Sequence, residues 1–537
     1  MAGQRSRPSL GTGLERPLRE TGLRTIDYIL KSVERFPDRP ALVDGGRRLT
    51  YRELDAETDR LARAMRAHGL RRQARVALYA PNGADVLVCL LALWRAGATW
   101  VPVNPRNAAD ANIAYMAYVG AEWLFYHSSF AADVARFEAE VPSLAQAICL
   151  DRELARFVAG DHPPLDDWAD PFGNLDELVG IFPTGGTTGP AKGVEVTNLG
   201  WGTMIETAMA AWDGASDAPV CLTTAPITHA AGPVATATMA LGATVVILPG
   251  FDAGAVLEAI ERHRVTHMFL PPTALYLLLA HPALGSHDYS SLRIFLLAGS
   301  PVSPEKLAQA VRAFGPAMCQ SYGQTEAPML ATWLPPAEVA AAVAGDRPER
   351  LASCGRPTRS VRVGIMGEEG RLLPPGEVGE IVVRGALVSR AYHQLPEATA
   401  EVRTHGWHHS GDVGRRDADG YLYIVDRKKD MIITGGFNVF SAEVEAAMME
   451  RPEVAECAVI GIPDEMWGEA VTALVVPQGG QAVDTDVLIA FAKARLGGVK
   501  APKAVHVWDA LPRTAAGKFD KRAMRARFWQ GEDRQVH

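Results

Sequence analysis

The loop that organises this sequence covers residues 184–193, which read Thr184-Gly185-Gly186-Thr187-Thr188-Gly189-Pro190-Ala191-Lys192-Gly193. Glycines let the backbone approach an anion closely and turn its N–H groups inward, while threonine hydroxyls and a lysine add donors and positive charge. Glycine and threonine alone would equally suit a flexible surface loop, but the clustered threonines and the lysine favour polyphosphate binding. The loop is not a P-loop, because Gly193 follows Lys192 where a serine or threonine would bind magnesium.

Segments of helical and strand length alternate on both sides of this loop. Before it, residues 51–70 and 85–96 have helical periodicity, and residues 76–80 and 100–103 resemble buried strands. After it, residues 253–264 are helix-like, and the strand-like segments are residues 243–248, 267–270 and 293–297. This alternation predicts an α/β fold in which helices cover a parallel sheet.

The pattern changes after Gly355. Short strands are predicted at residues 361–365, 379–384 and 421–425, with turn residues between them, which indicates a small β-rich subdomain. The charged run Asp426-Arg427-Lys428-Lys429-Asp430 then separates this large body from a compact tail, and we place a linker there. In the tail, Ser441 is expected to cap a helix whose Val444, Ala447 and Met448 share one face.

Bulk composition excludes several classes of protein. A chain of 537 residues is too long for one hydrophobic core, and a net charge of −8 argues against nucleic acid as a partner. The six cysteines are far apart and form no C-x-x-C pair, which is typical of reduced thiols in a cytoplasmic protein. The most apolar stretch, residues 86–103, is interrupted by Arg95 and Gly97, so no membrane span is expected; no apolar run follows the N-terminal arginines, so no signal peptide is expected either.

Four segments, in the expected order, resemble signatures of the adenylate-forming superfamily, which includes acyl- and aryl-CoA synthetases, carrier-protein adenylation domains and beetle luciferases. The first is the loop at residues 184–193. The other three are Ser321-Tyr322-Gly323-Gln324-Thr325-Glu326, then Ser410-Gly411-Asp412 followed by Asp426-Arg427, and finally Pro512-Arg513-Thr514-Ala515-Ala516-Gly517-Lys518 ending in Lys521. The loop departs from the family pattern at Gly185, where a serine is usual, and at Pro190-Ala191, where the proline commonly adjoins the lysine.

The resemblance implies an AMP-forming acid–CoA ligase. Such an enzyme uses ATP and Mg²⁺ to activate a carboxylic acid as an acyl-adenylate and then transfers the acyl group to coenzyme A. The implied architecture is a large N-terminal domain of stacked α/β/α subdomains plus a β-rich subdomain (residues 1–425), a hinge (426–430) and a small mobile α+β C-terminal domain with the catalytic lysine (431–537). A homodimer is an alternative to a monomer that the sequence leaves open.

The resemblance also assigns the nucleotide site. The ATP phosphates are expected to contact Thr184, Gly185, Gly186, Thr187, Thr188 and Lys192. Glu326 is a hard oxygen donor suited to Mg²⁺, Thr325 can donate to a phosphate oxygen, and Tyr322, between Ser321 and Gly323, offers a face on which adenine could stack. Asp412 can accept from the ribose hydroxyls with Arg427 steadying the sugar, although an aspartate after glycine is also a common turn residue. Gly299, Ser300 and Pro301 resemble the adenine-side loop, for which a plain strand-ending turn is the alternative.

The remaining implied residues concern catalysis and domain rotation. By resemblance, Lys518 enters the site and stabilises the charge that develops as the carboxylate attacks the α-phosphate; by composition alone it would be a solvated lysine. His229 matches a histidine between the acyl and CoA channels, with a structural histidine as the alternative. Lys429 matches the hinge position, and Gly435 and Gly436 match a loop that reaches the thiol tunnel, with a tight turn between a strand and a helix as the alternative.

Two other functions compete with this interpretation. A stand-alone adenylation enzyme would load a carrier protein, but those using amino acids place an aspartate where this chain has Thr228-His229-Ala230. A non-catalytic nucleotide-binding protein would be free to lose Lys518, Glu326 or Asp412, and all three are present. Apolar segments near Thr203, His229, Phe269 and Met329 favour an aryl, alicyclic or medium-chain acid, unless those residues belong to the core.

Overall fold

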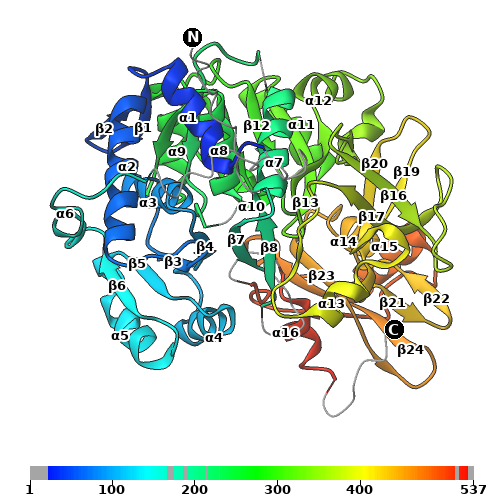
Figure 1. Ribbon diagram of the computed structural model, residues 1–537. Helices are drawn as coiled ribbons and strands as arrows, with labels where there is room; N and C mark the ends of the chain where they lie inside the picture. Colours follow the sequence, from blue (N-terminus) through cyan, green and yellow to red (C-terminus); the bar gives the residue numbers. More distant parts are fainter. Residues whose placement is uncertain are drawn as a thin grey trace, which may run out of the picture.

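The computed structural model describes residues 22–165, 175–184, 191–212, 214–228, 230–514 and 519–529. Two large sheets dominate the first part of the chain (Figure 1). The nine-stranded sheet has the order β15 (Arg356–Pro357), β14 (Ala327–Leu334), β13 (Met318–Gln324), β12 (Ile294–Leu297), β11 (His267–Leu270), β9 (Val220–Thr223), β10 (Thr244–Ile247), β1 (Pro40–Asp44) and β2 (Arg47–Thr50). The seven-stranded sheet has the order β18 (Ala391–Tyr392), β8 (Gly193–Thr197), β7 (Leu178–Pro183), β4 (Thr99–Pro102), β3 (Arg75–Tyr79), β5 (Trp123–Tyr126) and β6 (Gln146–Cys149).

Both sheets have a parallel centre; the nine-stranded sheet is antiparallel at both edges, whereas the seven-stranded sheet is antiparallel at its β18–β8–β7 edge and parallel at its β6 edge. Strand β12 pairs in parallel with β11 and β13, whereas β13 pairs antiparallel with β14. In the other sheet β3 pairs in parallel with β4 and β5, and β7 pairs antiparallel with β8. Parallel strands place their carboxyl ends at one edge, so the loops after β7, β12 and β13 are where ligands are expected in such folds.

Helices cover and separate these sheets. Helix α7 packs on β7 and β8 of one sheet and on β14 of the other, and α8 packs on β9, β10 and β11. The helices are α1 (Thr25–Arg35), α2 (Tyr51–Ala67), α3 (Ala84–Arg95), α4 (Ala109–Val119), α5 (Ala131–Glu140), α6 (Leu154–Phe157), α7 (Asn198–Trp212), α8 (Ala231–Ala240), α9 (Ala253–Arg262), α10 (Pro272–Leu279), α11 (Pro304–Phe314), α12 (Pro336–Val343), α13 (Pro396–Glu401), α14 (Ser441–Met448), α15 (Thr485–Leu496) and α16 (Lys521–Arg525). None of the helices in the described residues is long and apolar enough to cross a membrane.

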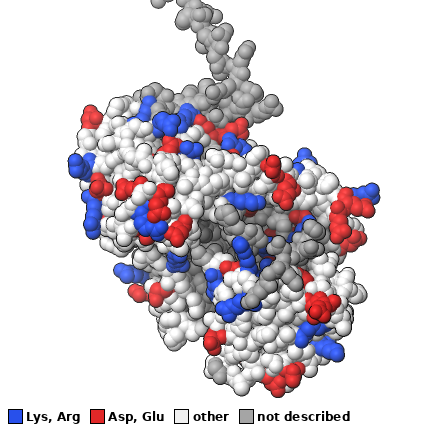
Figure 2. Space-filling model, turned by 90° about the horizontal axis from the view of Figure 1, so that it is seen from below, with Lys and Arg blue, Asp and Glu red and all other residues white. Residues whose placement is uncertain are grey.

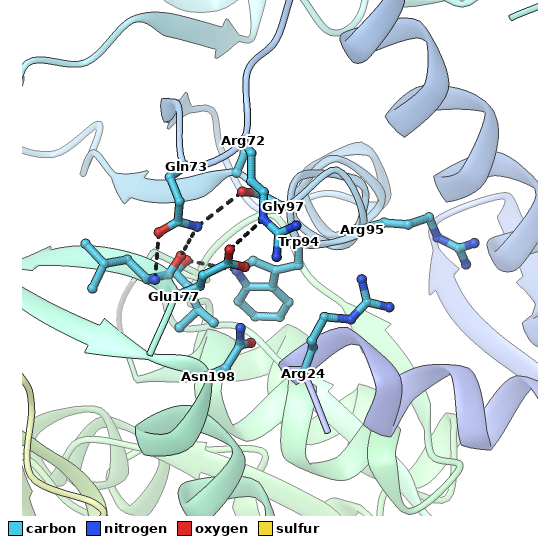
Figure 3. Close-up of a pocket in the computed structure, with 11 residues that line it drawn as sticks. Arg24, Arg72, Gln73, Trp94, Arg95, Gly97, Glu177 and Asn198 are labelled. Atoms are coloured by element: carbon cyan, nitrogen blue, oxygen red, sulfur yellow. Dashed lines mark hydrogen bonds and ion pairs between the residues drawn. The ribbon is translucent and has the colours of Figure 1, made fainter. Parts of the chain in front are cut away.

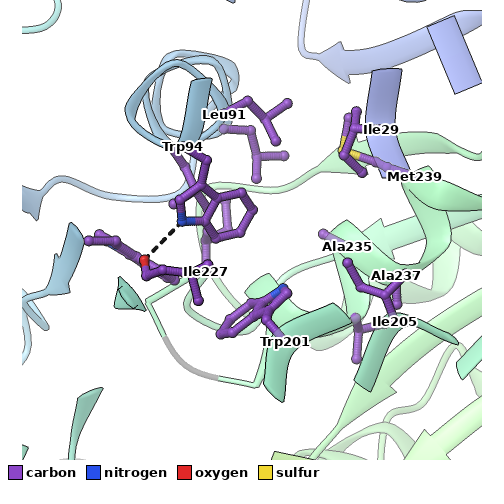
Figure 4. Close-up of a cluster of buried hydrophobic side chains, with 14 of the residues drawn as sticks. Ile29, Leu91, Trp94, Trp201, Ile205, Ile227, Ala235, Ala237 and Met239 are labelled. Atoms are coloured by element: carbon purple, nitrogen blue, oxygen red, sulfur yellow. Dashed lines mark hydrogen bonds between the residues drawn. The ribbon is translucent and has the colours of Figure 1, made fainter. Parts of the chain in front are cut away.

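The helices between the sheets are held by a buried apolar cluster (Figure 4). Trp94 of α3 lies against Trp201 of α7 with ring centroids 5.5 Å apart, and its indole N–H donates to the carbonyl of Val179 at 2.9 Å. Tryptophan suits this position because its large apolar ring packs on both neighbours while its polar N–H finds a partner. This cluster therefore ties the two sheets into one body.

The later part of the chain forms two smaller sheets. A four-stranded sheet has the order β16 (Val361–Met366), β17 (Val378–Gly385), β19 (His408–Arg416) and β20 (Leu422–Arg427). A five-stranded sheet contains β22 (Phe437–Val439), β21 (Ile432–Thr434), β24 (Gly468–Pro477) and β23 (Val454–Asp464), with β25 (Ala504–Val507) beside β24. This last sheet and helices α14 and α15 enclose a core of their own, in the orange and red part of Figure 1.

The predicted fold class is confirmed: a large α/β domain with a β-rich part is followed by a smaller α+β domain. The predicted boundaries at 425 and 431, and the mobility of the smaller domain, remain predictions. The predicted capping role of Ser441 is wrong. Ser441 is the first residue of α14, where its backbone N–H and its hydroxyl both donate to the carboxylate of Asp426, so a carboxylate from the preceding segment caps this helix.

Candidate active site

The ends of the phosphate loop are tied together at the β7–β8 hairpin. The N–H of Thr184 donates to the carbonyl of Lys192 at 2.9 Å, and the N–H of Lys192 donates to Oγ1 of Thr184 at 3.1 Å. These bonds extend the ladder of the antiparallel pair and fix where the loop leaves the sheet. The predicted phosphate ligands Gly185, Gly186, Thr187 and Thr188 lie outside the described residues.

Lys192 and Glu326 meet at the same tyrosine. The phenolic O–H of Tyr392 donates to Oε1 of Glu326 at 2.7 Å, and Nζ of Lys192 lies 4.8 Å from the centroid of the Tyr392 ring. The structure therefore brings the predicted phosphate-binding lysine next to the predicted Mg²⁺ ligand, although 134 positions separate them in the sequence. Sequence reasoning missed Tyr392; the signal available was an aromatic residue set between two ionisable residues, Arg390 and His393.

Ser321, Tyr322 and Gly323 lie on β13, and Thr325 follows in the turn to β14. A Cβ atom on Gly323 would lie 2.7 Å from the backbone nitrogen of Met329, so only glycine allows β14 to approach this closely. Tyr322 is buried, and its hydroxyl donates to Oδ2 of Asp412 at 2.7 Å. Burial, together with the charge of Asp412, raises the pKa of Tyr322, so its hydroxyl stays protonated as a donor. Stacking of adenine on this ring stays a prediction.

Asp412 and Arg427 are cross-strand partners on β19 and β20. Nε of Arg427 lies 3.2 Å from Oδ1 of Asp412. Glu380 supports the turn before Asp412, because it accepts from the N–H of Gly411 at 3.1 Å and from Nζ of Lys428 at 3.3 Å. The predicted ribose-binding carboxylate is thus buried, oriented by two side chains and linked to the charged run at 426–430.

The predicted adenine-side loop follows β12. Gly299 has φ +91°, a left-handed conformation that favours glycine, and nothing lies within 4 Å of where its Cβ would be. Gly299, Ser300 and Pro301 are exposed. Because β12 and β13 are parallel neighbours, this loop and the Thr325–Glu326 turn emerge from the same edge of the sheet. An open backbone there fits the predicted approach to a base.

The predicted hinge is surrounded by ion pairs. Asp430 accepts from Nη1 and Nη2 of Arg525 at 3.0 and 3.1 Å, and Nζ of Lys521 lies 2.7 Å from both Glu445 Oε1 and Ser441 Oγ. Burial, with a contribution from the nearby charge of Arg427, lowers the pKa of Lys429. Helix α16, which carries Lys521 and Arg525, is therefore fixed to the segment at 426–430 and to α14.

Gly435 and Gly436 form the turn between β21 and β22, with φ +56° and +80°. Two central residues with positive φ are what a two-residue hairpin turn requires. A Cβ on Gly435 would meet the Trp467 ring at 2.7 Å. Phe437 and Trp467 are exposed beside this turn, being 59% and 41% accessible. The turn joins two strands and not a strand and a helix as the alternative had it; its contact with a thiol tunnel stays a prediction.

Two predicted catalytic residues, Lys518 and His229, lie outside the described residues. The segments that flank Lys518 are fixed: Arg513 and Phe519 form an antiparallel bridge, and the N–H of Asp520 donates to the carbonyl of Pro512 at 2.8 Å. Near His229, a Cβ on Gly232 would lie 2.3 Å from the carbonyl oxygen of Ile227, so glycine is required at this close approach.

A small pocket lies away from these residues, between α1, α3, β7 and α7 (Figure 3). Its arginines are already paired: Arg72 with Glu177, Arg24 with Asp27, and Arg95 with Asp55. A site built to hold an anion would keep such cations available, so this pocket is a junction between elements.

On the face seen in Figure 2, acidic and basic side chains are interspersed over the described part of the surface.

The described residues fit a magnesium ion that comes with ATP better than a resident metal centre. No group of three or more histidine, cysteine, aspartate or glutamate side chains among them could hold a metal ion. Mg²⁺ is usually bound by one or two carboxylates plus substrate phosphates, and Glu326 supplies one such carboxylate close to Lys192.

Comparison with known proteins matches both parts of the chain. The family model for AMP-binding enzymes matches residues 29–393, and the model for the AMP-binding enzyme C-terminal domain matches residues 443–518. A medium/long-chain-fatty-acid–CoA ligase, FadD8 of Mycobacterium tuberculosis, is 38% identical over 95% of this chain and 90% of its own length. A feruloyl-CoA synthase of an Amycolatopsis species is 41% identical over 92% of this chain and 96% of its own.

Among solved structures, the o-succinylbenzoate CoA synthetase MenE of Bacillus subtilis, in complex with its acyl-adenylate intermediate, superposes with a TM-score of 0.83. It is 27% identical, and the match covers 95% of this chain and 99% of that one. The chain therefore matches such enzymes over nearly its whole length, in fold as well as in sequence.

Proposed function

We propose that this chain, which belongs to the AMP-binding enzyme family, is an acid–thiol ligase that joins a hydrophobic carboxylic acid to coenzyme A at the expense of ATP. The predictions of the family and of an AMP-forming ligase are confirmed by the family match and by relatives named as CoA ligases. The acid, the thiol acceptor and the role of each residue are the proposed parts.

The observation that carries the proposal is a continuous set of contacts across the nucleotide site. Lys192 lies on the ring of Tyr392, whose hydroxyl binds Glu326. Glu326 follows β13, on which Tyr322 binds Asp412, and Asp412 pairs with Arg427. This order of a cation and two carboxylates supports the proposal that Lys192, Glu326 and Asp412 serve the phosphates, Mg²⁺ and the ribose of ATP.

In the first half-reaction, a carboxylate oxygen of the acid attacks the α-phosphorus of ATP, and the bond to pyrophosphate breaks. Lys192 binds phosphate oxygens, and Asp412 and Arg427 orient the ribose. Glu326 would hold Mg²⁺, which would supply positive charge to the phosphates. Lys518 is assigned, by resemblance, to stabilise the charge on the α-phosphate. No general base is required, because a carboxylic acid is already ionised at neutral pH.

In the second half-reaction, the thiol of coenzyme A attacks the acyl carbonyl carbon and AMP leaves with the electron pair of the carbon–oxygen bond. The thiol proton goes to solvent or to AMP. By resemblance, His229, Lys429, Gly435 and Gly436 are assigned to this step, which follows rotation of the C-terminal domain. A carrier protein as acceptor is the alternative, and it would use the same adenylate.

The proposed acid is aryl, alicyclic or of medium chain length. Phe269 and Met329, which were expected near the acyl group, belong to the buried hydrophobic core, which is the alternative stated for them, and Thr203 on α7 donates its hydroxyl to the carbonyl of Leu199 at 2.7 Å. Relatives with feruloyl and fatty-acid names are consistent with an apolar acid.

The buried, free cysteines of the described structure support a reducing compartment such as the cytoplasm. A homodimer stays a prediction, which sedimentation can test.

The test is pyrophosphate release with ATP and Mg²⁺ across a panel of aryl, alicyclic and aliphatic acids, with and without coenzyme A. Release that depends on one acid and yields its CoA thioester supports the proposal and names the substrate. Release without efficient thioester formation indicates a carrier protein. A Lys518→Ala variant with unchanged acid-dependent release would contradict the assigned role of that lysine, and no release despite ATP binding would favour a non-catalytic homologue.

A further inference from the structure

We propose that Tyr392 is a positioning residue of the nucleotide site. It separates the carboxylate of Glu326 from the ammonium group of Lys192 and fixes the position of each. The inference rests on the proposed function, because it assigns these two groups to Mg²⁺ and to the ATP phosphates. It adds a residue that lies in none of the motifs that carry the family resemblance.

Tyr392 contacts the two groups through different parts of its side chain. Its hydroxyl donates to Oε1 of Glu326 at 2.7 Å, and its ring faces Nζ of Lys192 at 4.8 Å from the centroid. The hydroxyl is the donor in this hydrogen bond, because an ionised carboxylate can only accept. The hydrogen bond occupies one oxygen of Glu326, and within the described part of the chain the other oxygen is left for a cation.

The uncharged side chain of Tyr392 keeps Lys192 and Glu326 from forming an ion pair with each other. A lysine and a glutamate that both serve a nucleotide site would otherwise form an ion pair, which satisfies each charge with the other. None of the ion pairs found among the described residues joins Lys192 to Glu326. The ring attracts the cation through its face while the hydroxyl satisfies the carboxylate, so both charges remain available to a ligand.

Tyr392 is itself held firmly at the edge of the seven-stranded sheet. Strand β18 pairs antiparallel with β8, with Tyr392 opposite Val194 and Ala391 opposite Glu195. Both neighbours of this strand bind the Glu195 carboxylate: Nη2 and Nε of Arg390 donate to it at 2.7 and 2.9 Å, and Nδ1 of His393 lies 2.8 Å from it. A two-residue strand is weak alone, and this clamp fixes its register.

The segment before β18 also fixes Glu326 directly. The N–H of Ser389 donates to the backbone carbonyl of Glu326 at 2.7 Å. The backbone of Glu326 and its carboxylate are therefore both bound by residues 389–392, whereas Lys192 leads directly into β8, to which β18 is paired. This single short segment links the phosphate loop to the turn that carries the metal ligand.

The experiment compares three variants by isothermal titration with ATP at a series of Mg²⁺ concentrations, without acid, and then by pyrophosphate release with the acid found in the panel. Tyr392→Phe keeps the ring and removes the hydroxyl, and Tyr392→Leu removes both. Tyr118→Phe is the matched control, because its hydroxyl donates to the carbonyl of the adjacent His393 and touches neither charged group.

We expect Tyr392→Phe to raise the Mg²⁺ concentration for half-maximal ATP binding by about tenfold, since residues that orient metal ligands typically contribute 10–100-fold. The KM for the acid should not change. Tyr392→Leu should also weaken ATP binding at saturating Mg²⁺, and Tyr118→Phe should behave as wild type.

Equal Mg²⁺ dependence in Tyr392→Phe and the wild type would overturn the inference, as would the same shift in Tyr118→Phe. A wild-type chain that binds ATP but releases no pyrophosphate with any acid would contradict the proposed function alone, because the binding comparison still tests Tyr392. A wild-type chain that does not bind ATP would overturn both.

Discussion

The hydroxyl of Tyr322 donates a 2.7 Å hydrogen bond to the carboxylate of Asp412, which stands 90 positions later in the chain. Tyr322 belongs to β13 of the nine-stranded sheet and Asp412 to β19 of the four-stranded sheet. One contact therefore joins two of the motifs that the sequence presents separately. For the proposed contact with the ribose, a carboxylate that is already oriented lowers the entropic cost of binding the nucleotide.

Tyr322→Phe should weaken ATP binding without unfolding the chain. The substitution leaves Oδ2 of Asp412 buried without this donor, and a lost hydrogen bond to a charged group costs about 1.5–3 kcal/mol. We expect the KM for ATP to rise by about tenfold or more, measured by pyrophosphate release at saturating acid. Tyr423→Phe is the control, since its hydroxyl binds Asp417 at 3.1 Å, away from the site. Equal effects in the two variants would contradict the role of the Tyr322–Asp412 bond.

Lys521→Met should destabilise the chain strongly. Its ammonium group is 2.7 Å from Glu445, and the two side chains are only 12% and 20% exposed. Removing the cation leaves a largely buried carboxylate unpaired, which costs about 3 kcal/mol in unfolding free energy measured with urea. Arg495→Ala breaks an exposed pair with Glu450 and should cost about 0.5 kcal/mol or less.

The double variant Lys521→Met/Glu445→Gln separates charge from packing. Burial raises the pKa of Glu445, and the charge of Lys521 opposes that rise, so the charged carboxylate is less favoured once Lys521 is removed. Removing that charge should return part of the stability lost in Lys521→Met. A double variant that is less stable than the single one would contradict this explanation.

Stability should fall as the pH is lowered from about 6.5 to about 4. Burial lowers the pKa of His267 to about 4, with Thr266 Oγ1 2.7 Å from its Nδ1, and lowers that of His408 to about 4 as well. Between these pH values the unfolded chain binds protons at these histidines and the folded chain does not. The free energy of unfolding therefore decreases as the pH falls through this window, and these two histidines do not change it above the window. Each histidine contributes at most about 1.4 kcal/mol per pH unit.

His267→Phe should reduce this slope by about 1.4 kcal/mol per pH unit or less, whatever its effect at neutral pH. The measurement is urea unfolding at several pH values between 4 and 7, followed by circular dichroism. A slope identical to that of the wild type would show that His267 also titrates in the folded chain.

Gly435→Ala should slow thioester formation more than adenylate formation, if the turn reaches the thiol as the resemblance implies. A Cβ there would meet the Trp467 ring at 2.7 Å, whereas at Gly436 nothing lies within 4 Å. Both positions belong to the assigned loop, have positive φ and share a backbone cost of about 1–2 kcal/mol, so comparison with Gly436→Ala separates the clash with Trp467 from that backbone cost. Pyrophosphate exchange and acyl-CoA formation report the two half-reactions. Equal slowing of both in Gly435→Ala would contradict the assignment.

Local pattern predicted most of the α/β architecture. The run at residues 267–270 coincides with β11, and the helical periodicity at 51–70 matches α2, which ends at Ala67. These predictions succeed because hydrophobic periodicity is set by the backbone repeat and is visible in a short window. The prediction that Ser441 caps α14 was wrong because it depends on a contact outside the local window. A serine before an apolar helix suits a cap, but here the carboxylate of Asp426 accepts from the N–H and the hydroxyl of Ser441.

The sequence by itself determined the family, the alternation of helix and strand, and the residue types that ATP and Mg²⁺ require, because each is written in contiguous residues. Only the tertiary structure decided that Tyr392 stands between Lys192 and Glu326 and that Tyr322 orients Asp412. The Tyr392–Glu326 and Tyr322–Asp412 contacts join segments of different sheets, and the Lys192–Tyr392 contact joins segments at the paired strands β8 and β18, all across long sequence separations. No periodicity or spacing encodes them, since they depend on how the sheets pack against each other.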